Sequence, residues 1–239
     1  MQLFYQPNIL PQDIEVVFSR EESKHIVRVL RKKEGDLLFL TNGKGHLFKT
    51  EITVASQNAC ISRIISSEET EIPNYHLHLA IAPTKMNDRY ETFLEKATEI
   101  GVHEITPLIC DNSERKIIKL NRFERVLQSA MKQSLQTRLP VLNKPVPFSE
   151  FVQKEIPGQK FIAHCEDESE KKPLLAQLRN KPEITKTTIL IGPEGDFSPS
   201  EIKTVLKYDW KAISLGSNRL RTETAAIVAC HTVALVQGV

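Results

Sequence analysis

The sequence predicts an α/β protein in which a mostly parallel sheet follows a smaller β-rich unit. From residue 76 onward, short apolar runs rich in β-branched residues alternate with segments of helical periodicity. Such alternation is typical of a parallel sheet covered by helices. Before residue 70, the runs alternate polar and apolar residues and are separated by glycine turns, as in antiparallel strands. We therefore expect two domains, residues 1–70 and 71–239.

The first domain is expected to be a small β-barrel with one helix. Its strands are predicted at residues 38–43, 46–54 and 59–65, with Asn42 and Gly43 in a hairpin turn. The polar, proline-bearing segment 66–74 is predicted to be the linker.

The helix of this first domain is predicted at residues 21–31. Ser19 is the candidate N-terminal cap, and Ile26, Val29 and Leu30 are expected to face inward.

The second domain is predicted from the strand and helix patterns after residue 76. Strands are expected at residues 76–82, 104–109, 160–164, 187–191 and 212–215. Helices are expected at residues 88–100, 121–136, 171–179, 199–207 and 223–236. Gly101 is the predicted C-terminal cap of the first of these helices.

Composition favours a cytoplasmic enzyme. The 239 residues are 40% hydrophobic and 26% charged, which is ordinary for a globular protein. The chain has no uninterrupted apolar stretch of membrane-spanning length and no secretory signal pattern at its start. Its cysteines are far apart without a C-x-x-C pair, so we expect buried thiols and neither a metal site nor a disulfide framework: Cys60, Cys110, Cys165 and Cys230.

The positive charge is concentrated in the middle of the chain. Residues 115–144 contain eight lysines and arginines against one acid, Glu124. A solvated helix face is one explanation for such a run. The one-signed bias also suits contacts with a nucleic-acid backbone, where lysine and arginine release counterions, and we favour that interpretation.

Two loops near the C-terminus predict a ligand pocket. The segments 191–201 (IGPEGDFSPSE) and 215–225 (LGSNRLRTETA) each begin at the end of an apolar run, break at glycine and lead into a helical pattern. In an open α/β sheet, ligands bind beyond the carboxyl ends of the strands, and glycine lets the backbone approach them. Neither loop has the Walker or the G-x-G-x-x-G pattern. We therefore expect a cofactor site built largely of main chain.

Both loops also have a purely structural interpretation. Ser198 and Glu201, with Pro199 between them, form the pattern of a capping box, which starts a helix without any ligand. The second loop is harder to explain in this way, because a helix start needs one cap and not two arginines and a glutamate.

Five segments together resemble one family. They are HIVRVLR with Gly35-Asp36 (25–36), KMNDRYETFLEKATEIGVHEITPL (85–108), AMKQSLQTRLP (130–140) and the two C-terminal loops. In this order they resemble the SPOUT class of methyltransferases. Within that class the sequence is similar to the family that methylates N3 of a uridine in bacterial small-subunit (16S) ribosomal RNA. The resemblance covers the whole chain.

The resemblance implies a trefoil knot in the second domain, a PUA-like RNA-binding barrel in the first, and a homodimer. S-adenosylmethionine is the implied cofactor, and no metal is implied. The implied partner is 16S ribosomal RNA, within the small ribosomal subunit. The residues that the resemblance assigns to the cofactor are His164, Cys165, Ile191, Gly192, Pro193, Glu194, Gly195, Leu215, Gly216, Ser217, Leu220 and Thr222.

The sequence departs from the family pattern in places, among them Ser217-Asn218, which replaces a more rigid turn. Asp196 stands where a second glycine is expected after Gly195, and its carboxylate is expected either to contact the cofactor's amino group or to tighten the loop. Arg138 stands later than the arginine of the family's glutamine–arginine helix.

Methylation of uracil N3 requires a proton acceptor, because N3 carries a proton, and a cation near the flanking carbonyl oxygens. Arg221 is the candidate cation, and Glu223 and Glu194 are the candidate acceptors. The alternative is a structural clamp in which Arg221 pairs with one of the two glutamates.

The candidate RNA-binding residues are Arg28, Arg31, Lys85, Arg89, Arg115 and Arg138. Two other functions remain open. One is methylation of a different RNA position, such as a transfer-RNA ribose. The other is a ribosome-assembly factor that binds RNA without catalysis.

Overall fold

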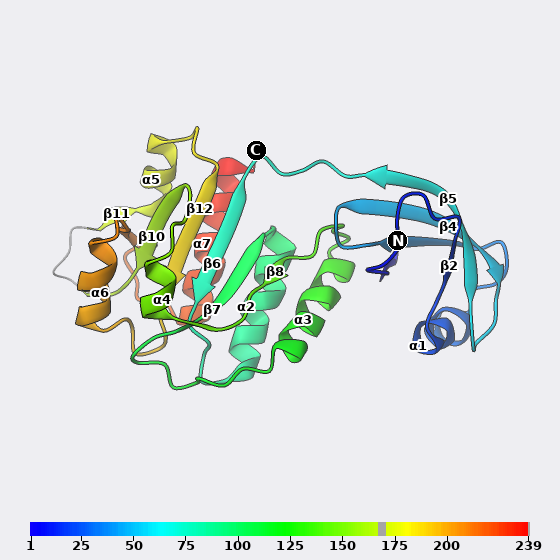
Figure 1. Cartoon of the computed structure of the whole chain (residues 1–239), viewed down its shortest axis with the longest axis horizontal. Coiled ribbons are helices and arrows are strands. Elements are labelled where there is room, and N and C mark those ends of the chain that lie inside the picture. Colours follow the sequence, from blue (N-terminus) through cyan, green and yellow to red (C-terminus); the bar gives the residue numbers. More distant parts are fainter. Residues whose placement is uncertain (167–170, 239) are drawn as a thin grey trace. The chain divides into compact units, whose positions relative to one another are not determined.

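The computed structural model describes residues 1–166 and 171–238 and divides into two compact units (Figure 1). Unit 1 contains Met1–Ile72 together with Met131–Leu139, and unit 2 contains Pro73–Ala130 and Pro140–Val239. The chain thus leaves unit 1, returns to it for residues 131–139, and leaves it again, which the sequence did not predict.

Unit 1 is built on a five-stranded sheet of order β1-β3-β4-β5-β2. Its strands are β1 (Leu3–Tyr5), β2 (Glu15–Val17), β3 (Leu37–Thr41), β4 (His46–Val54) and β5 (Ile61–Glu69). The predicted β3–β4 hairpin is confirmed, with Gly43 at φ 73° in the turn. The predicted linker is wrong in part. Residues 66–69 continue β5, because their backbone pairs with the start of β4 despite their polar side chains.

The helix of unit 1 changes type after one turn. It comprises α1 (Arg20–Lys24) and the π-helical turn η1 (His25–Val29), and the predicted cap at Ser19 accepts a hydrogen bond from Glu22 N. Ile26 is buried as expected, whereas Val29 is 63% exposed. The prediction for Val29 assumed regular α-helical periodicity. The wider π turn changes the angular spacing and points this side chain to solvent.

Residues 137–139 attach to the β3–β4 turn of unit 1. The carbonyl of Thr137 accepts hydrogen bonds from Gly45 N and Thr41 Oγ1, both at 2.9 Å. The guanidinium of Arg138 donates to the carbonyls of Lys44 and Thr70, at 3.1 and 3.2 Å. A Cβ at Gly45 would lie 2.3 Å from this guanidinium, so only glycine leaves room for it.

Unit 2 contains a parallel sheet of order β11-β13-β10-β12-β6-β7-β8, with β9 paired to β7. Its strands are β6 (His76–Ile81), β7 (Glu104–Ile109), β8 (Val141–Leu142), β9 (Val146–Pro147), β10 (Gln159–Ala163), β11 (Lys172–Pro173), β12 (Lys186–Ile191) and β13 (Lys211–Ser214). Every pairing in this sheet is parallel, as the strand and helix alternation predicted.

Helices cover both faces of this sheet (Figure 1). They are α2 (Asn87–Ile100), α3 (Leu120–Gln133), α4 (Phe148–Val152), α5 (Leu174–Asn180), α6 (Pro199–Leu206) and α7 (Thr222–Gln237). Gly101 caps α2 in the left-handed conformation, as predicted. The prediction missed α4, a single short turn, and placed the end of α3 too late, because Leu135 leaves helical geometry at φ 60°. No helix among the described residues combines the length and apolar character needed to cross a bilayer.

Along each strand, successive side chains point alternately to the two faces of the unit 2 sheet. On β6, the Leu79 and Ile81 positions belong to the face covered by α7, whereas Ala80 packs with Phe151 of α4 and Ile202 of α6. Toward the amino end of β6, the α4 face carries His78, which is 8% exposed.

His78 lies in a polar environment at this end of the strand. Its Nε2 is 2.7 Å from Thr106 Oγ1 and 3.7 Å from Glu104 Oε1 of β7. Burial, the largest effect, lowers the pKa of His78 from 6.5 to about 4; Glu104 opposes this shift, and His76 and Lys154 add to it. The ring is therefore neutral at neutral pH.

We predict that His78 makes the fold acid-sensitive. Because its folded pKa lies below its unfolded pKa, the unfolded chain takes up the proton first, so stability is fully present above pH 6.5 and is lost as pH falls toward 4. Urea unfolding at pH 7 and pH 4.5 should show that His78→Gln reduces this loss by roughly 2 kcal/mol. His231→Gln, on the exposed side of α7, should keep the wild-type pH dependence. An unchanged pH dependence in His78→Gln would contradict the prediction.

Candidate functional site

The candidate site lies at the carboxyl edge of the unit 2 sheet. Ala163 of β10 pairs with Ile191 of β12 on one side and with Ile213 of β13 on the other. Ile191 in turn pairs with Ile81 of β6. The loops that follow these strands therefore leave the sheet at one edge, which is where ligands bind in such folds.

A pocket of about 620 Å³ opens between the loops that follow β10 and β13. Its lining is Ala163, His164, Cys165, Lys171, Ile213, Ser214, Leu215, Gly216, Ser217, Asn218, Arg219, Leu220 and Ala225. The predicted cofactor residues of the 164–165 and 215–220 loops are among them. The predicted residues 191–195 and Thr222 are not, although they belong to elements adjoining the same edge.

Gly216 presents bare backbone to this pocket. Its φ of 139° disfavours any residue with a side chain, and a Cβ there would meet no heavy atom within 4 Å. Ser214 Oγ accepts a hydrogen bond from Gly216 N at 3.2 Å and donates one to its carbonyl at 3.0 Å. The loop is thus held by its own side chain while its inner surface stays open.

Asp196 braces the two neighbouring loops. Its Oδ2 accepts a hydrogen bond from Cys165 N at 2.7 Å, and its Oδ1 accepts one from Phe197 N at 2.8 Å. Its backbone is left-handed, with φ 62°, which explains why glycine is expected at this position. Of the two roles predicted for this carboxylate, the structure shows the tightening of the loop.

Glu194 fastens the 192–196 loop to the loop after β6. Its Oε1 accepts a hydrogen bond from Lys85 N at 2.9 Å. Arg115 holds the same segment by donating to the carbonyl of Lys85, at 2.7 and 3.2 Å, and to Asn87 Oδ1. Glu194, predicted as a proton acceptor and cofactor residue, and Arg115, predicted to bind RNA, therefore both hold the backbone of Lys85.

Arg221 and Glu223 stand at the start of α7, the next element after the pocket loop. Arg221 is the exposed N-cap residue, and among the described residues its side chain has no hydrogen-bond or ion-pair partner. Glu223 is 9% exposed, and its buried Oε2 has no hydrogen-bond partner within the described parts of the chain. The predicted clamp between Arg221 and a glutamate is not formed.

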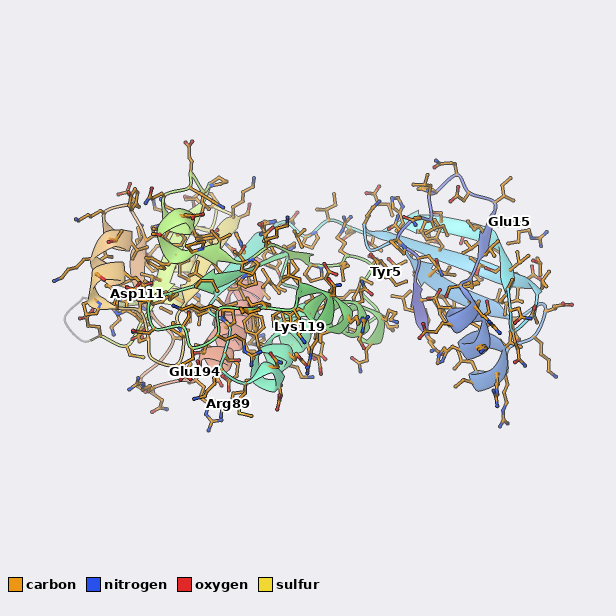
Figure 2. The ribbon with its side chains drawn as sticks, turned by 60° about the horizontal axis from the view of Figure 1, so that its bottom comes forward. Tyr5, Glu15, Arg89, Asp111, Lys119 and Glu194 are labelled. Carbon is orange, nitrogen blue, oxygen red and sulfur yellow. The ribbon has the colours of Figure 1, made fainter. Side chains whose placement is uncertain are left out.

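Arg89 of α2 forms an ion pair with Glu223. Its Nε lies 4.0 Å from Glu223 Oε1. Figure 2 labels Arg89 and Glu194 along the same side of unit 2. Arg89 was predicted to guide RNA; the structure places it beside the carboxylate that was predicted to accept a proton.

His164 and Cys165, which follow β10, form the wall of the pocket that faces the 215–220 loop. His164 is 7% exposed, and burial, followed by the charge of Lys171, lowers the pKa of its imidazole. Lys171 Nζ donates to the His164 carbonyl at 3.2 Å. Cys165 is exposed, contrary to the expectation of a buried thiol, whereas Cys60, Cys110 and Cys230 are buried.

The capping box that starts α6 is confirmed as a structural device. Ser198 and Glu201 exchange hydrogen bonds, with Pro199 at the first helical position. Glu201 also accepts a hydrogen bond from Asp111 N at 3.0 Å, and burial raises the pKa of its carboxyl. This glutamate is fully engaged in holding the helix start.

The remaining RNA-binding predictions divide by unit. In unit 1, Arg28 and Arg31 are exposed, whereas the guanidinium of Arg138 is engaged on backbone carbonyls. In unit 2, Lys119 just before the basic helix α3 and Arg125 within it are exposed, while Arg122 pairs with Glu91 at 2.5 Å.

Two supporting residues were not predicted from the sequence. Asn112 Nδ2 donates to the carbonyls of Gly195 and Asp196, both at 3.1 Å, and Lys171 lines the pocket. Asn112 follows β7 without any motif around it, and Lys171 was absorbed into a predicted helix. No local pattern marks either side chain.

Comparison with known proteins gives the same two-part division. Residues 70–234 match the family model of an RNA methyltransferase domain, and residues 18–65 match that of an RNA methyltransferase PUA domain. The chain is 27% identical over 229 residues to ribosomal RNA small subunit methyltransferase E of Rickettsia conorii, covering 95% of this chain and 92% of the relative.

Solved structures resemble the whole chain. A probable rRNA-methyltransferase from Porphyromonas gingivalis is 37% identical, with a TM-score of 0.87 and coverage of 99% of this chain and 98% of that one. Ribosomal RNA small subunit methyltransferase E from Neisseria gonorrhoeae, solved bound to S-adenosyl methionine, is 26% identical with a TM-score of 0.86, covering 100% of this chain and 98% of that one. With its parallel sheet, its pocket at the carboxyl edge and these matches, the chain belongs to the RNA methyltransferase family and carries that family's PUA domain.

Proposed function

We propose that this protein methylates N3 of a specific uridine in 16S ribosomal RNA, using S-adenosylmethionine. The observation that carries the proposal is the junction of the pocket with the start of α7. There, the exposed backbone of Gly216 is followed along the chain by Arg221, a cation without a partner among the described residues, and by Glu223, whose buried Oε2 has no hydrogen-bond partner within them.

The pocket residues fit this cofactor. A volume of about 620 Å³ lies in the range of small-molecule sites, roughly 300–1,000 Å³. The backbone of Leu215, Gly216 and Ser217 would face the bound molecule, with His164 and Leu220 as walls. Residues 191–195 would act less directly, since Asp196 and Glu194 fasten their loop to its neighbours. When bound, S-adenosylmethionine supplies an electrophilic methyl group on a sulfonium.

Glu223 and Arg221 have different roles in the reaction of the uracil. As the bond between N3 and the methyl carbon forms, the methyl–sulfur bond breaks, and the N3 proton passes to the free oxygen of Glu223. Arg221 stabilises the negative charge that develops on the flanking carbonyl oxygens of the uracil. Arg89 orients the carboxylate from its other oxygen, at 4.0 Å. Glu194 is a positioning residue, because its carboxylate holds the Lys85 backbone.

RNA would be held by basic side chains that remain exposed. In unit 1 these are Arg28 and Arg31, and in unit 2 they include Arg125 of α3 and Lys119 just before it. The N3 edge of a uridine is normally paired, so the target must be unstacked before it reaches the site. We expect the protein to act in the cytoplasm on the small ribosomal subunit.

Two further features belong to the proposal. The passage from β13 at one side of the sheet to α7, which packs against α2, β6 and β12, is compatible with a trefoil knot. The exposed side of α7, with Leu235 at 60% exposure, is the surface that we propose for a homodimer.

The proposal is tested by incubating the protein with labelled S-adenosylmethionine and small subunits from a strain that lacks the modification. Nucleoside analysis should find the label on uridine N3. Label on a ribose or on another base would keep the fold and overturn the substrate assignment. Cofactor binding without label on subunits, naked RNA or transfer RNA would instead indicate a non-catalytic assembly factor.

We predict that Asp196→Asn weakens cofactor binding by about tenfold, equivalent to about 1.4 kcal/mol. An amide keeps the left-handed backbone accessible but cannot accept from both Cys165 N and Phe197 N. Asp209→Asn is the matched control, because Asp209 also has a positive φ, of 61°, and lies outside the pocket. Calorimetric titration with S-adenosylmethionine measures both variants, and equal affinities would show that the brace does not shape the pocket.

We predict that Glu223→Gln lowers kcat by about 100-fold or more, which is typical of the loss of a general base. Arg221→Ala should lower kcat similarly, with partial recovery in Arg221→Lys, because the charge rather than the fork shape matters most. Cofactor affinity should stay within about twofold of wild type, since neither side chain lines the pocket. Glu150→Gln, an exposed carboxylate on α4, is the control. A kcat of Glu223→Gln close to wild type would exclude Glu223 as the proton acceptor.

A further inference from the structure

The α4 face of the unit 2 sheet changes character along its strands. In their carboxyl halves, the strands give this face the apolar residues Ala80, Leu108 and Leu190. Two residues earlier on each strand, the same face carries His78, Thr106 and Thr188, all at most 8% exposed. A face that only had to pack against a helix would stay apolar, so these polar positions need another explanation.

The polar end of this face opens into a second pocket. Its volume is about 540 Å³, and it lies entirely within unit 2. It is lined by His76, His78, Glu104, Thr106, Asn143, Lys144, Val146, Phe151, Lys154, Glu155, Ile156, Pro157, Lys186, Thr187 and Thr188. Register explains the clustering, because His78 pairs with Thr188 on one side and with Glu104 on the other.

This pocket has a preformed polar floor. Asn143 Nδ2 donates to Glu104 Oε1 at 2.6 Å and to Thr106 Oγ1 at 2.8 Å. The same hydroxyl lies 2.7 Å from His78 Nε2. These bonds hold the side chains in place before any ligand arrives, which lowers the entropic cost of binding.

The rim of the pocket has an excess of positive charge, with three exposed lysines against one exposed glutamate, Glu155. Lys144, Lys154 and Lys186 are exposed, and none has an ion-pair partner within the described residues. Glu104 in the floor is also negative, although it accepts a hydrogen bond from Asn143, and the neutral His78 adds no charge, so the lysines leave the lining with one net positive charge. The ring of Phe151 forms one wall, with Lys154 Nζ 5.9 Å from its centroid.

We propose that this second pocket binds a phosphorylated nucleotide, either free or as part of an RNA chain. The lysines match a phosphate group, the half-exposed His76 ring offers a surface for a planar base, and the partly exposed Asn143 amide can bind its polar edge. The volume suits a ligand of this size.

This pocket is separate from the candidate cofactor site. It lies at the amino ends of β6 and β12, whereas the cofactor pocket lies beyond the carboxyl ends of β10 and β13, at the opposite edge of the same parallel sheet. A strand of six residues separates the two edges by about 16 Å. The inference therefore does not depend on the proposed methyltransferase chemistry.

The test is calorimetric titration of the full-length protein with uridine monophosphate, with and without saturating S-adenosylhomocysteine. We expect binding that S-adenosylhomocysteine does not abolish, and none to uridine, which lacks the phosphate. Lys154→Gln/Lys186→Gln should bind at least about tenfold more weakly. Lys203→Gln/Lys207→Gln, which removes the same charge from the exposed side of α6, should bind like wild type.

A hexauridylate competitor identifies the source of the nucleotide. Displacement of uridine monophosphate would show that a phosphodiester in an RNA chain is accepted, and no displacement would assign the pocket to a free monoester. Equal affinities in the two lysine double variants, or no binding to the wild type, would overturn the proposal. Because both double variants change only exposed side chains, loss of folding does not confuse the outcome.

Discussion

The parallel register of β10, β12 and β13 is the constraint on which the candidate site depends. Ala163 stands between Ile191 and Ile213, so the loops that follow the three strands begin side by side. Register alone does not shape a pocket, because loops that leave one edge can still spread apart. The hydrogen bonds of Asp196 supply the missing restraint by tying the 192–196 loop to Cys165. The pairing of the strands thus determines where the loops leave the sheet, and the carboxylate of Asp196 keeps two of these loops close together.

The choice of aspartate at a left-handed position follows from the size of the competing terms. A left-handed backbone costs a non-glycine residue roughly 1–2 kcal/mol. Hydrogen bonds to a charged acceptor contribute about 1.5–3 kcal/mol each, and Asp196 accepts two from backbone amides. The bonds therefore outweigh the backbone cost. Glycine would remove the backbone cost but also the brace, leaving the loop to be held by Asn112 alone on that side.

Local patterns in the sequence predicted local structure well. The strand runs of unit 2, the caps at Ser19, Ser198 and Gly101, and the glycine loops of the pocket all follow from short-range rules. The failures involve contacts between distant segments. Nothing near residues 131–139 indicates that they pair with the β3–β4 turn, and nothing near Glu223 indicates Arg89. Arg221 and Glu223 were predicted as candidate reactive residues from their types alone. The pairing of Glu223 with Arg89 arises only in the packed fold.

Charged residues that look equivalent in the sequence have different environments in the structure. The guanidinium groups of Arg115 and Arg138 donate hydrogen bonds to backbone carbonyls of their own units, whereas Arg221 is exposed without such a partner among the described residues. Glu223, in contrast to the exposed Arg221, is buried, and its Oε2 has no hydrogen-bond partner among the described residues. Leaving a buried carboxylate oxygen without a hydrogen bond costs about 1–3 kcal/mol or more. Packing does not require that cost, because glutamine or a hydrophobic residue of similar volume would avoid the buried charge. In the function proposed above, the N3–H of the bound uracil is the donor that satisfies this oxygen.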